Sequence, residues 1–424
     1  MRKNIPMLFF AHAGEDRVKK QQVIKSFFGN RYNTFLLFLL GFHILLHVSI
    51  TNVPADFLFD SAYYIPACRA MLAGQGDTNL AHPSLSKVFI ALSIKMFGDC
   101  QLGWRFFSIT FGMLSLVTIY FFVKKMTNNY NAALTSVVLL SFENLFWIHS
   151  GIAMLDIYML VFITLSFLCY SYGNNRLSSV SLALGALCKL TAVYGLVVII
   201  GYHTISFIRN IKKRESIKRK VKELGAWIAI YSSTFLVLFI LGLLILDLAF
   251  TPFSSPIDHL KYMWSVYGSL TRTAGPMGIG SYPWTWWFPY WLVQPIPYYV
   301  VRIVVGGVVS YPIHFLGVIS PVIAYSTVPS MIYVFWDYTQ NNNSFALFVL
   351  SWFLGTYLPW FLWAFLNKVT YVYYALPSVE AVCCAMALAL TNKKLPMLLL
   401  VVFMVAVLVN FFILFPCTPW IQLK

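Results

Sequence analysis

The chain has 424 residues, of which 59% are hydrophobic, 18% aromatic and only 10% charged, and its mean hydropathy is +0.74. Soluble domains carry about 25% charged residues, so this composition excludes a soluble globular protein and indicates a polytopic membrane protein. The net charge of +16 does not indicate nucleic-acid binding, because the basic residues crowd into two segments, 2–31 and 209–222. Short basic segments beside membrane spans mark the cytoplasmic side and attract anionic headgroups.

The N-terminal segment, residues 1–31, is expected to be cytoplasmic, and its charged region is too long for a cleaved signal peptide. The apolar runs that follow are continuous rather than alternating, so they predict helices and exclude the strands of a barrel. We therefore expect an all-α membrane domain over residues 32–424 with about 11 transmembrane helices. The predicted spans are residues 33–51, 105–123, 131–149, 153–172, 177–188, 190–208, 225–249, 313–336, 345–366, 371–391 and 395–416.

The region 177–208 is predicted to be a broken pair of helices rather than one span. A single span would move the basic loop 209–222 to the outside, against the positive-inside rule. Lys189 then falls at the outer tip of the pair, where an ammonium group avoids the cost of burial in lipid. With the N-terminus inside and the C-terminus outside, three stretches face outward: the loop 52–104, the turn before Asp156, and the aromatic loop 250–312.

The loop 52–104 is predicted to contain two short helices. Residues 61–73 and 86–97 show apolar residues at helical spacing, which suits helices that lie in the membrane interface. His82-Pro83 sets up the second of them. Cys68 and Cys100 both fall in this loop, and a disulfide between them is an open alternative.

Charged residues gather at the predicted outer ends of the helices. Asp60 and Asp156 are carboxylates at outer helix edges, and Arg105, Lys189 and Lys368 are cations at outer helix ends. Charged groups near membrane spans are rare and usually functional. A carboxylate beside cations at a membrane surface suits an anionic lipid headgroup that is held while a nearby hydroxyl is deprotonated.

Each of these residues also has a purely structural interpretation. Asp60 would cap the helix that begins at Ser61, and the three cations would be interface anchors that extend to headgroups. His82 would be a helix-start residue without chemistry. The aromatic segment SYPWTWWFPYW is equally ambiguous, because rings stack on sugar faces and also anchor proteins at interfaces. The candidates for sugar or lipid contact are Tyr63, Tyr64, Trp284 and Trp286.

The segment FDSAYYIPACRAMLAGQGDTNLAHPSLSK, residues 59–87, resembles the first outer loop of the dolichyl-phosphate-mannose–protein mannosyltransferases, a family of GT-C glycosyltransferases. The resemblance continues in the same order through most of the chain, and the ordered set is more specific than any single motif. The further segments are GWRFFSITFG (103–112), AMLDIY (153–158), ALCKLTAVYG (186–195), SYPWTWWFPYWLVQPIPYYV (281–300) and YLPWFLWAFLNKVTYVYYALP (357–377).

The resemblance implies an inverting transferase that moves a mannose-like hexose from a polyprenyl- or dolichyl-phosphate donor to an acceptor hydroxyl on the outer face of a prokaryotic plasma membrane. Asp60 matches the family's catalytic aspartate and would be the general base. Asp156 and His82 would orient the acceptor or a neighbouring cation. Arg105, Lys189 and Lys368 would bind the donor phosphate. The acceptor, whether a protein Ser or Thr, a glycan or a lipid, and the oligomeric state stay open.

Five positions depart from the family pattern, two of them being Ser84 and Ser86 in the segment after His82-Pro83. Ser61 stands in place of a glutamate, Ala81 in place of a common acidic residue, and Lys368 in place of an arginine. Two missing carboxylates leave few oxygen ligands for a divalent ion, so we expect no cofactor and keep a metal only as a weak alternative. The competing functions are a transporter or flippase for lipid-linked sugar, which would favour internal repeats that are not visible here, and a non-catalytic binder of such a lipid.

Overall fold

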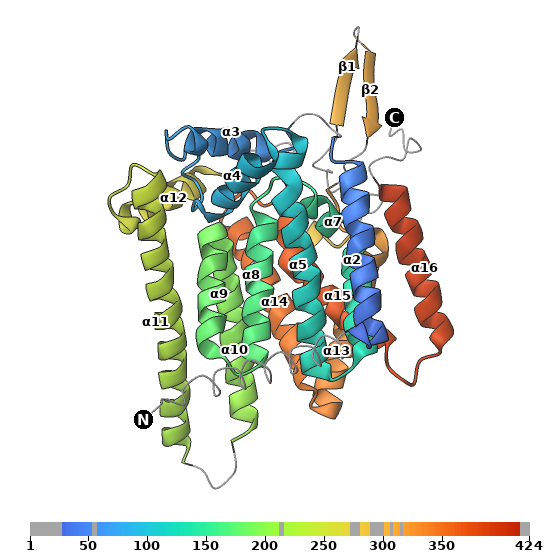
Figure 1. The fold of residues 1–424 in the computed structure, drawn as a ribbon. Helices are drawn as coiled ribbons and strands as arrows, with labels where there is room; N and C mark the ends of the chain where they lie inside the picture. Colours follow the sequence, from blue (N-terminus) through green and yellow to red (C-terminus); the bar gives the residue numbers. More distant parts are fainter. Residues whose placement is uncertain are drawn as a thin grey trace, which may run out of the picture.

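The computed structural model describes residues 28–52, 57–211, 216–271, 280–288, 301–305, 308–313 and 317–415. Most of the basic segment 1–31 therefore lies outside the described residues, as do residues 272–279, 289–300 and 306–307 of the aromatic loop 250–312. The fold is almost entirely helical, as predicted. Figure 1 shows a bundle of long helices crossed at its upper end by two shorter ones.

The bounds of the helices follow in chain order. They are α2 Arg31–Ser49, α3 Ser61–Leu72, α4 Leu85–Phe97, α5 Gln101–Thr127, α6 Tyr130–Ser141, α7 Asn144–Ser150, α8 Asp156–Ser171, α9 Asn175–Cys188, α10 Val193–Arg209, α11 Ile217–Phe250, α12 Pro256–Ser269, α13 Pro321–Asn341, α14 Ser344–Phe365, α15 Leu376–Leu390 and α16 Met397–Leu414. Short 3₁₀ turns lie at Leu190–Ala192, Pro283–Thr285 and Val372–Ala375.

Seven helices of the described part are long and apolar enough to cross a membrane, or eight if one bent pair counts as a span. The multi-pass architecture is thus confirmed, whereas the predicted number of about eleven spans is not established. The bent pair is α6 and α7, which meet at 72° where one straight span over 131–149 was predicted. Glu143 explains the bend, because its carboxylate accepts from the Phe146 amide at 2.7 Å and from the Ser320 amide at 2.8 Å.

The predicted break at Lys189 is confirmed. Helix α9 ends at Cys188, Lys189 has an extended backbone with φ −157° and ψ 130°, and a 3₁₀ turn leads into α10. Helix α9 packs against α8 and α11, while α10 packs against α14. The break therefore brings Lys189 to the upper end of the bundle instead of its middle.

The two short helices of the loop 52–104 are also confirmed, as α3 and α4. Figure 1 shows α3 lying across the upper end of the bundle, as a helix in the interface plane would. Cys68 and Cys100 are free thiols, so the alternative of a disulfide is wrong. Buried polar contacts hold the loop instead, chiefly an ion pair between the fully buried side chains of Asp77 and Lys87.

The region after residue 300 differs from the prediction. Val301–Val305 and Val308–Ile313 form an antiparallel hairpin, β1 and β2, and helix α13 begins only at Pro321. The span predicted from residue 313 therefore starts too early. Valine-rich runs suit a strand as well as a membrane helix, and proline at the first helical position sets the true start.

Candidate active site

Asp60 stands at the junction between the first span and α3. The residue before it, Phe59, has φ +52°, a left-handed conformation that a non-glycine side chain adopts at a cost of about 1–3 kcal/mol. The Phe59 ring is held edge-on against Tyr371 and Tyr373, with ring centroids 6.0 and 5.6 Å apart. The Asp60 side chain makes no capping hydrogen bond to α3, so its interpretation as a helix cap is wrong. Its Oδ2 instead accepts a long hydrogen bond of 3.4 Å from the Tyr64 hydroxyl.

The surroundings of Asp60 suit a base. Burial of the carboxyl group raises its pKa to about 6, with the nearby negative charge of Asp156 adding to the rise. The positive charge of Lys189 and the hydroxyls of Tyr64 and Tyr373 oppose that rise. A carboxylate with a pKa near 6 accepts a proton more readily than an ordinary aspartate and is still ionised at neutral pH.

Asp156 and Lys189 form a buried ion pair beside Asp60. The Lys189 ammonium donates to Oδ1 of Asp156 at 2.7 Å and to Oδ2 at 2.9 Å, and both side chains are at most 4% exposed. The same ammonium lies 5.0 and 5.2 Å from the ring centroids of Tyr373 and Tyr374. Asp156 is the first residue of α8, where the helix dipole favours a negative charge. One carboxylate, one cation and two aromatic faces thus converge next to the candidate base.

His82 connects the loop after α3 to α12. Its Nδ1 lies 2.7 Å from the Tyr267 hydroxyl, and its ring meets the Tyr64 and Tyr267 rings edge-on at 6.1 and 5.8 Å. Burial lowers the pKa of His82 well below its usual value, and the charges of Lys189 and Lys87 lower it further. His82 is therefore neutral at physiological pH and acts through hydrogen bonding rather than charge.

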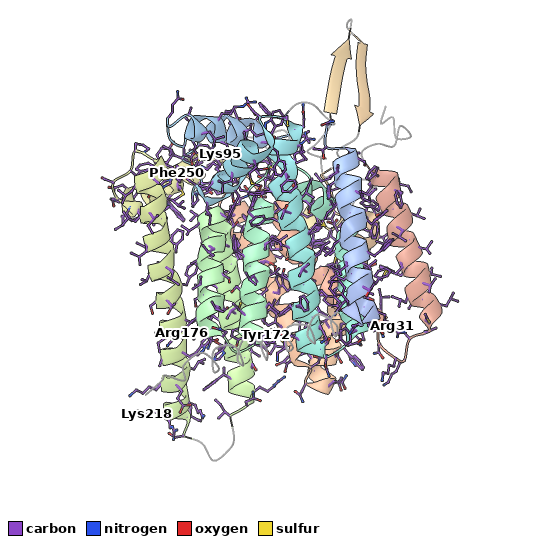
Figure 2. The ribbon with its side chains drawn as sticks, viewed as in Figure 1. Arg31, Lys95, Tyr172, Arg176, Lys218 and Phe250 are labelled. Carbon is purple, nitrogen blue, oxygen red and sulfur yellow. The ribbon has the colours of Figure 1, made fainter. Side chains whose placement is uncertain are left out.

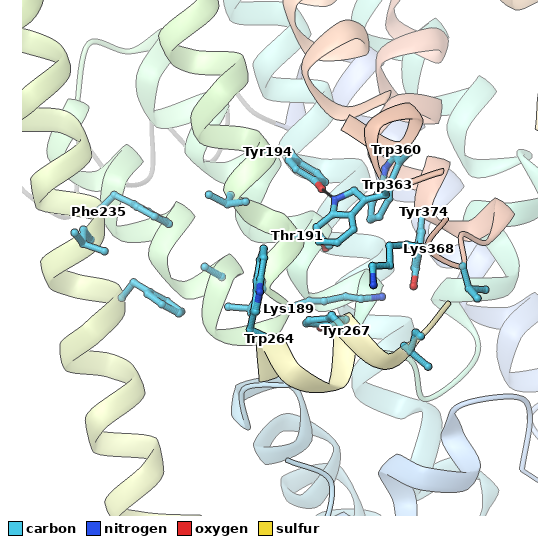
Figure 3. Close-up of a pocket in the computed structure, with 17 residues that line it drawn as sticks. Lys189, Thr191, Tyr194, Phe235, Trp264, Tyr267, Trp360, Trp363, Lys368 and Tyr374 are labelled. Carbon is cyan, nitrogen blue, oxygen red and sulfur yellow. Dashed lines mark hydrogen bonds between the residues drawn. The ribbon is translucent and has the colours of Figure 1, made fainter. Parts of the chain in front are cut away.

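An apolar cavity of about 350 Å³ opens beside this cluster. Its walls come from α10, α11, α12 and α14, and Lys189, Lys368 and Tyr374 lie together at one end. Figure 3 shows the two lysine side chains and the Tyr374 hydroxyl pointing toward one another, with Phe235 at the far side of the cavity. The Lys368 ammonium also donates to the Gly268 carbonyl at 2.5 Å. The cavity is therefore apolar along its length and positively charged at the end near Asp60.

Lys189 and Lys368 line this cavity, and Asp60, Tyr64, His82 and Asp156 form the cluster beside it. The other four predicted site residues have different surroundings. Arg105 is buried and donates to the Thr51 carbonyl at 2.6 Å. Tyr63 is 65% exposed on α3. Trp284 stacks on Tyr282, and Trp286 is buried and donates to the Ser281 hydroxyl at 2.9 Å. The structure brings together Asp60, Tyr64, His82, Asp156, Lys189 and Lys368. Arg105 borders a small space together with Ser61, the neighbour of Asp60, and the other three make their contacts elsewhere.

The aromatic residues that do line the cavity are different ones, namely Tyr194, Phe235, Phe239, Trp264, Tyr267, Trp360, Trp363 and Tyr374. The last three lie in the segment 357–377, and the resemblance of that segment to the family was the feature of the sequence that pointed to them. Trp264 and Tyr267 carried no signal, because α12 falls within a stretch predicted to be a loop. Within the described residues, no group of three or more His, Cys, Asp or Glu side chains is placed to hold a metal ion, and the lack of a cofactor stays a prediction.

The helical bundle with α3 across its end and a cavity below it has the fold of the GT-C membrane glycosyltransferases. The Saccharomyces cerevisiae protein O-mannosyltransferase Pmt1-Pmt2 complex bound to the sugar donor matches with a TM-score of 0.74 at 11% identity, over 92% of this chain and 90% of that one. ArnT from Cupriavidus metallidurans bound to undecaprenyl phosphate matches with a TM-score of 0.55 at 11% identity, over 85% and 61%.

Sequence comparison makes the assignment more specific. Residues 35–254, just over half of the chain, match the profile of the dolichyl-phosphate-mannose-protein mannosyltransferases, and the chain belongs to this family. A curated relative, the polyprenol-phosphate-mannose–protein mannosyltransferase of Corynebacterium glutamicum, is 24% identical over 78% of this chain and 76% of its own length. The family predicted from the ordered motifs is thereby confirmed, and the chain is a membrane glycosyltransferase.

Proposed function

We propose that this protein transfers a mannose-like hexose from a polyprenyl-phosphate donor to an acceptor hydroxyl, with inversion at the anomeric carbon. One observation carries the proposal: the apolar cavity ends in Lys189 and Lys368, directly beside the cluster that contains Asp60. An isoprenoid chain needs an apolar channel and its phosphate needs cations, and this cavity supplies both in that order. Membership of the mannosyltransferase family and the polyprenol-phosphate-mannose in the name of the Corynebacterium glutamicum relative support the same donor.

The donor phosphate is assigned to the cationic end of the cavity. An ammonium group has three N–H donors, and Lys368 gives one of them to Gly268, which leaves others for phosphate oxygens. Lys189 adds a positive charge that is fixed in place by Asp156. Arg105 lies outside the cavity lining and supports the loop before Asp60 through its bond to the Thr51 carbonyl. These charges stabilise the phosphate as it gains negative charge during departure.

The chemical step is a single displacement. The Asp60 carboxylate removes the proton from the acceptor hydroxyl while that oxygen forms a bond to the anomeric carbon. The bond between that carbon and the phosphate oxygen breaks, and its electron pair leaves with the polyprenyl phosphate. The proton ends on Asp60, and the sugar passes through an oxocarbenium-like transition state. No general acid is required, because a phosphate is a weak base and a good leaving group.

Neighbouring groups orient this reaction. Asp156 holds Lys189, and the neutral imidazole of His82 fixes the Tyr267 hydroxyl at the cavity wall. The names of the curated mannosyltransferase relatives indicate a protein acceptor. We place the protein in the plasma membrane with its N-terminus cytoplasmic and Asp60 facing outside, because the basic residues at the lower end follow the positive-inside rule.

The direct test uses the purified full chain in lipid vesicles with radiolabelled mannosyl-phosphoryl-polyprenol and a Ser- and Thr-rich peptide. We expect mannose to appear on the peptide with the anomeric configuration opposite to that of the donor. Movement of the labelled lipid between leaflets without transfer to any hydroxyl would instead favour a flippase. Binding without either activity would favour a non-catalytic role.

The pH profile of transfer reports on Asp60. Its pKa is raised to about 6, and only the ionised form accepts a proton. We therefore expect kcat/KM to rise about tenfold per pH unit below that value and to level off above it. The measurement is the initial rate at low donor concentration between pH 4.5 and pH 8. A profile with no acid limb above pH 5 would contradict the assignment of Asp60 as the base.

Filling the cavity is expected to weaken donor binding. Leu236 on α11 lines the cavity, and Leu236→Trp places an indole where an isoprenoid would lie. Excluding two methylene groups costs about 1.6 kcal/mol, so we expect the KM for the donor to rise about tenfold or more, with kcat little changed. The matched control is Leu241→Trp, which lies on the same helix, is 52% exposed and is not part of the cavity lining. Equal effects of the two substitutions would show that the cavity does not hold the donor.

A further inference from the structure

We propose that a second cavity, at the opposite end of the bundle from Asp60, binds the phosphate headgroup of an anionic phospholipid. This lower cavity has a volume of about 460 Å³ and is formed where α8 ends, α9 begins and α10 ends. It shares no residue with the cavity beside Asp60, and its assignment does not depend on the proposed reaction. Figure 2 shows Tyr172, Arg176 and Lys218 at this end and Lys95 and Phe250 at the other.

The lining of the lower cavity is rich in small hydrogen-bonding side chains, Ser171, Asn175, Ser206 and Asn210. His203 lies on one wall and is fixed from two sides. Its Nδ1 is 2.8 Å from the Tyr170 hydroxyl, and its ring stacks on Trp227 with centroids 3.5 Å apart and planes 7° apart. Hydroxyl and amide groups around a fixed imidazole suit the oxygens of a phosphodiester.

Basic residues border the lower cavity, and two of them also have partners elsewhere. Arg209 donates to the Asn342 carbonyl at 3.3 Å and to the Ser344 hydroxyl at 3.4 Å, and Lys220 is paired with Glu223 at 3.0 Å. Each of four helices brings one basic residue next to a lining residue or an aromatic ring of the rim: Lys125 at the end of α5, Arg176 at the start of α9, Arg209 at the end of α10 and Lys220 at the start of α11. The Lys220 ammonium lies 5.7 Å from the ring centroid of Phe207, a lining residue, and the Lys125 ammonium lies 4.6 Å from that of Tyr172. Basic residues near a cavity of hydroxyl and amide groups favour an anionic membrane component.

The same helices carry exposed apolar residues beside the rim, which suits an amphiphilic ligand. Leu177 on α9 is 53% exposed, Ile208 on α10 is 57% exposed, and Val221 on α11 is 63% exposed. A soluble phosphate compound gains nothing from these side chains. A phospholipid places its acyl chains along them while its headgroup enters the polar cavity.

The positive-inside rule alone accounts for basic residues at this end, but it does not account for their arrangement. The orientation of the spans in the membrane requires only an excess of basic residues on the cytoplasmic side. It requires neither a hollow lined with hydroxyl and amide groups nor a stacked histidine inside that hollow. A substitution that fills the cavity without changing charge therefore separates the two explanations.

The test is native mass spectrometry of the full chain released from bilayers that contain equal amounts of phosphatidylglycerol and phosphatidylcholine. We expect the wild-type protein to retain phosphatidylglycerol preferentially. Ser206→Phe, which fills the cavity at constant charge, should abolish this preference. Arg209→Gln should weaken retention about fivefold, the equivalent of 1 kcal/mol. Lys393→Gln removes an exposed cation in the turn between α15 and α16, and it should change nothing.

Three outcomes would overturn the proposal. One is an unchanged preference for phosphatidylglycerol in Ser206→Phe, and another is an equal loss in Arg209→Gln and Lys393→Gln. The third is complete displacement of the bound lipid by millimolar inorganic phosphate, which would assign the cavity to a soluble anion. The midpoint of thermal unfolding in detergent is measured for each variant, and Arg209→Gln supplies an independent test if Ser206→Phe does not fold.

Discussion

Asp60→Asn is expected to lower kcat for mannosyl transfer by about three orders of magnitude, within the range of about 10²–10⁴ that a general base contributes. The substitution keeps the shape of the side chain and removes only its ability to accept a proton. Asp60 makes no capping bond to α3, and its hydrogen bond to Tyr64 is long, so the fold loses little. The KM for the donor should change by less than a factor of about three, because the phosphate is assigned to Lys189 and Lys368.

The matched control for this variant is Asp99→Asn. Asp99 also lies on the loop between the first span and α5, but its carboxylate is 46% exposed and is paired with Arg69 at 2.8 Å. We expect its transfer rate to stay within a factor of about two of the wild type. If Asp60→Asn transferred mannose as fast as Asp99→Asn, the base would have to be another group, and Asp156 would be the nearest carboxylate to consider.

The fold was predictable where a single charge decided the local structure. Lys189 could not lie in the middle of a span, so the break between α9 and α10 followed from the sequence alone. The bend between α6 and α7 was not predictable in this way. It depends on Glu143 and its bond to the Ser320 amide, a partner far along the chain that no local pattern reveals. The hairpin β1–β2 was missed because valine-rich runs are common to strands and spans.

The site was predictable as a list of residues but not as an arrangement. Asp60, Asp156 and Lys189 were each identified from their positions at helix ends, whereas the bidentate pairing of the last two depends on how α8 and α9 pack. Arg105 satisfied the same sequence criterion and yet bonds to the Thr51 carbonyl. A cation at a helix end indicates proximity to the membrane surface, and only packing decides which cations face the cavity.

Ser61, which departs from the family pattern, is part of the turn that leads into α3. Ser61 is 2% exposed, and its hydroxyl donates to the Leu58 carbonyl within the turn that leads into α3. A glutamate at this position would have to bury a second carboxylate close to Asp60. Asp60 is therefore the one acidic residue at the start of α3. Its raised pKa comes from burial and from Asp156, and no carboxylate at position 61 contributes to it.

The pair Asp156–Lys189 allows its structural and catalytic contributions to be measured separately. Removing one partner leaves the other as an uncompensated buried charge, so Lys189→Met alone should destabilise the protein by about 3–5 kcal/mol. Asp156→Asn alone should do the same. The double variant Asp156→Asn/Lys189→Met removes both charges. Its free energy of unfolding should return to within about 1 kcal/mol of the wild type. The measurement is a denaturant unfolding curve in a fixed detergent.

Activity should not return with stability in that double variant. Lys189 faces the cationic end of the cavity, and the loss of one group that stabilises developing charge costs about 10²–10³ in kcat. A double variant that is stable but about a hundredfold slower would show that the Lys189 charge acts on the departing phosphate. If the stable double variant regained the full wild-type rate, Lys189 would serve only to neutralise Asp156, and Lys368 would be left as the cation that receives the phosphate.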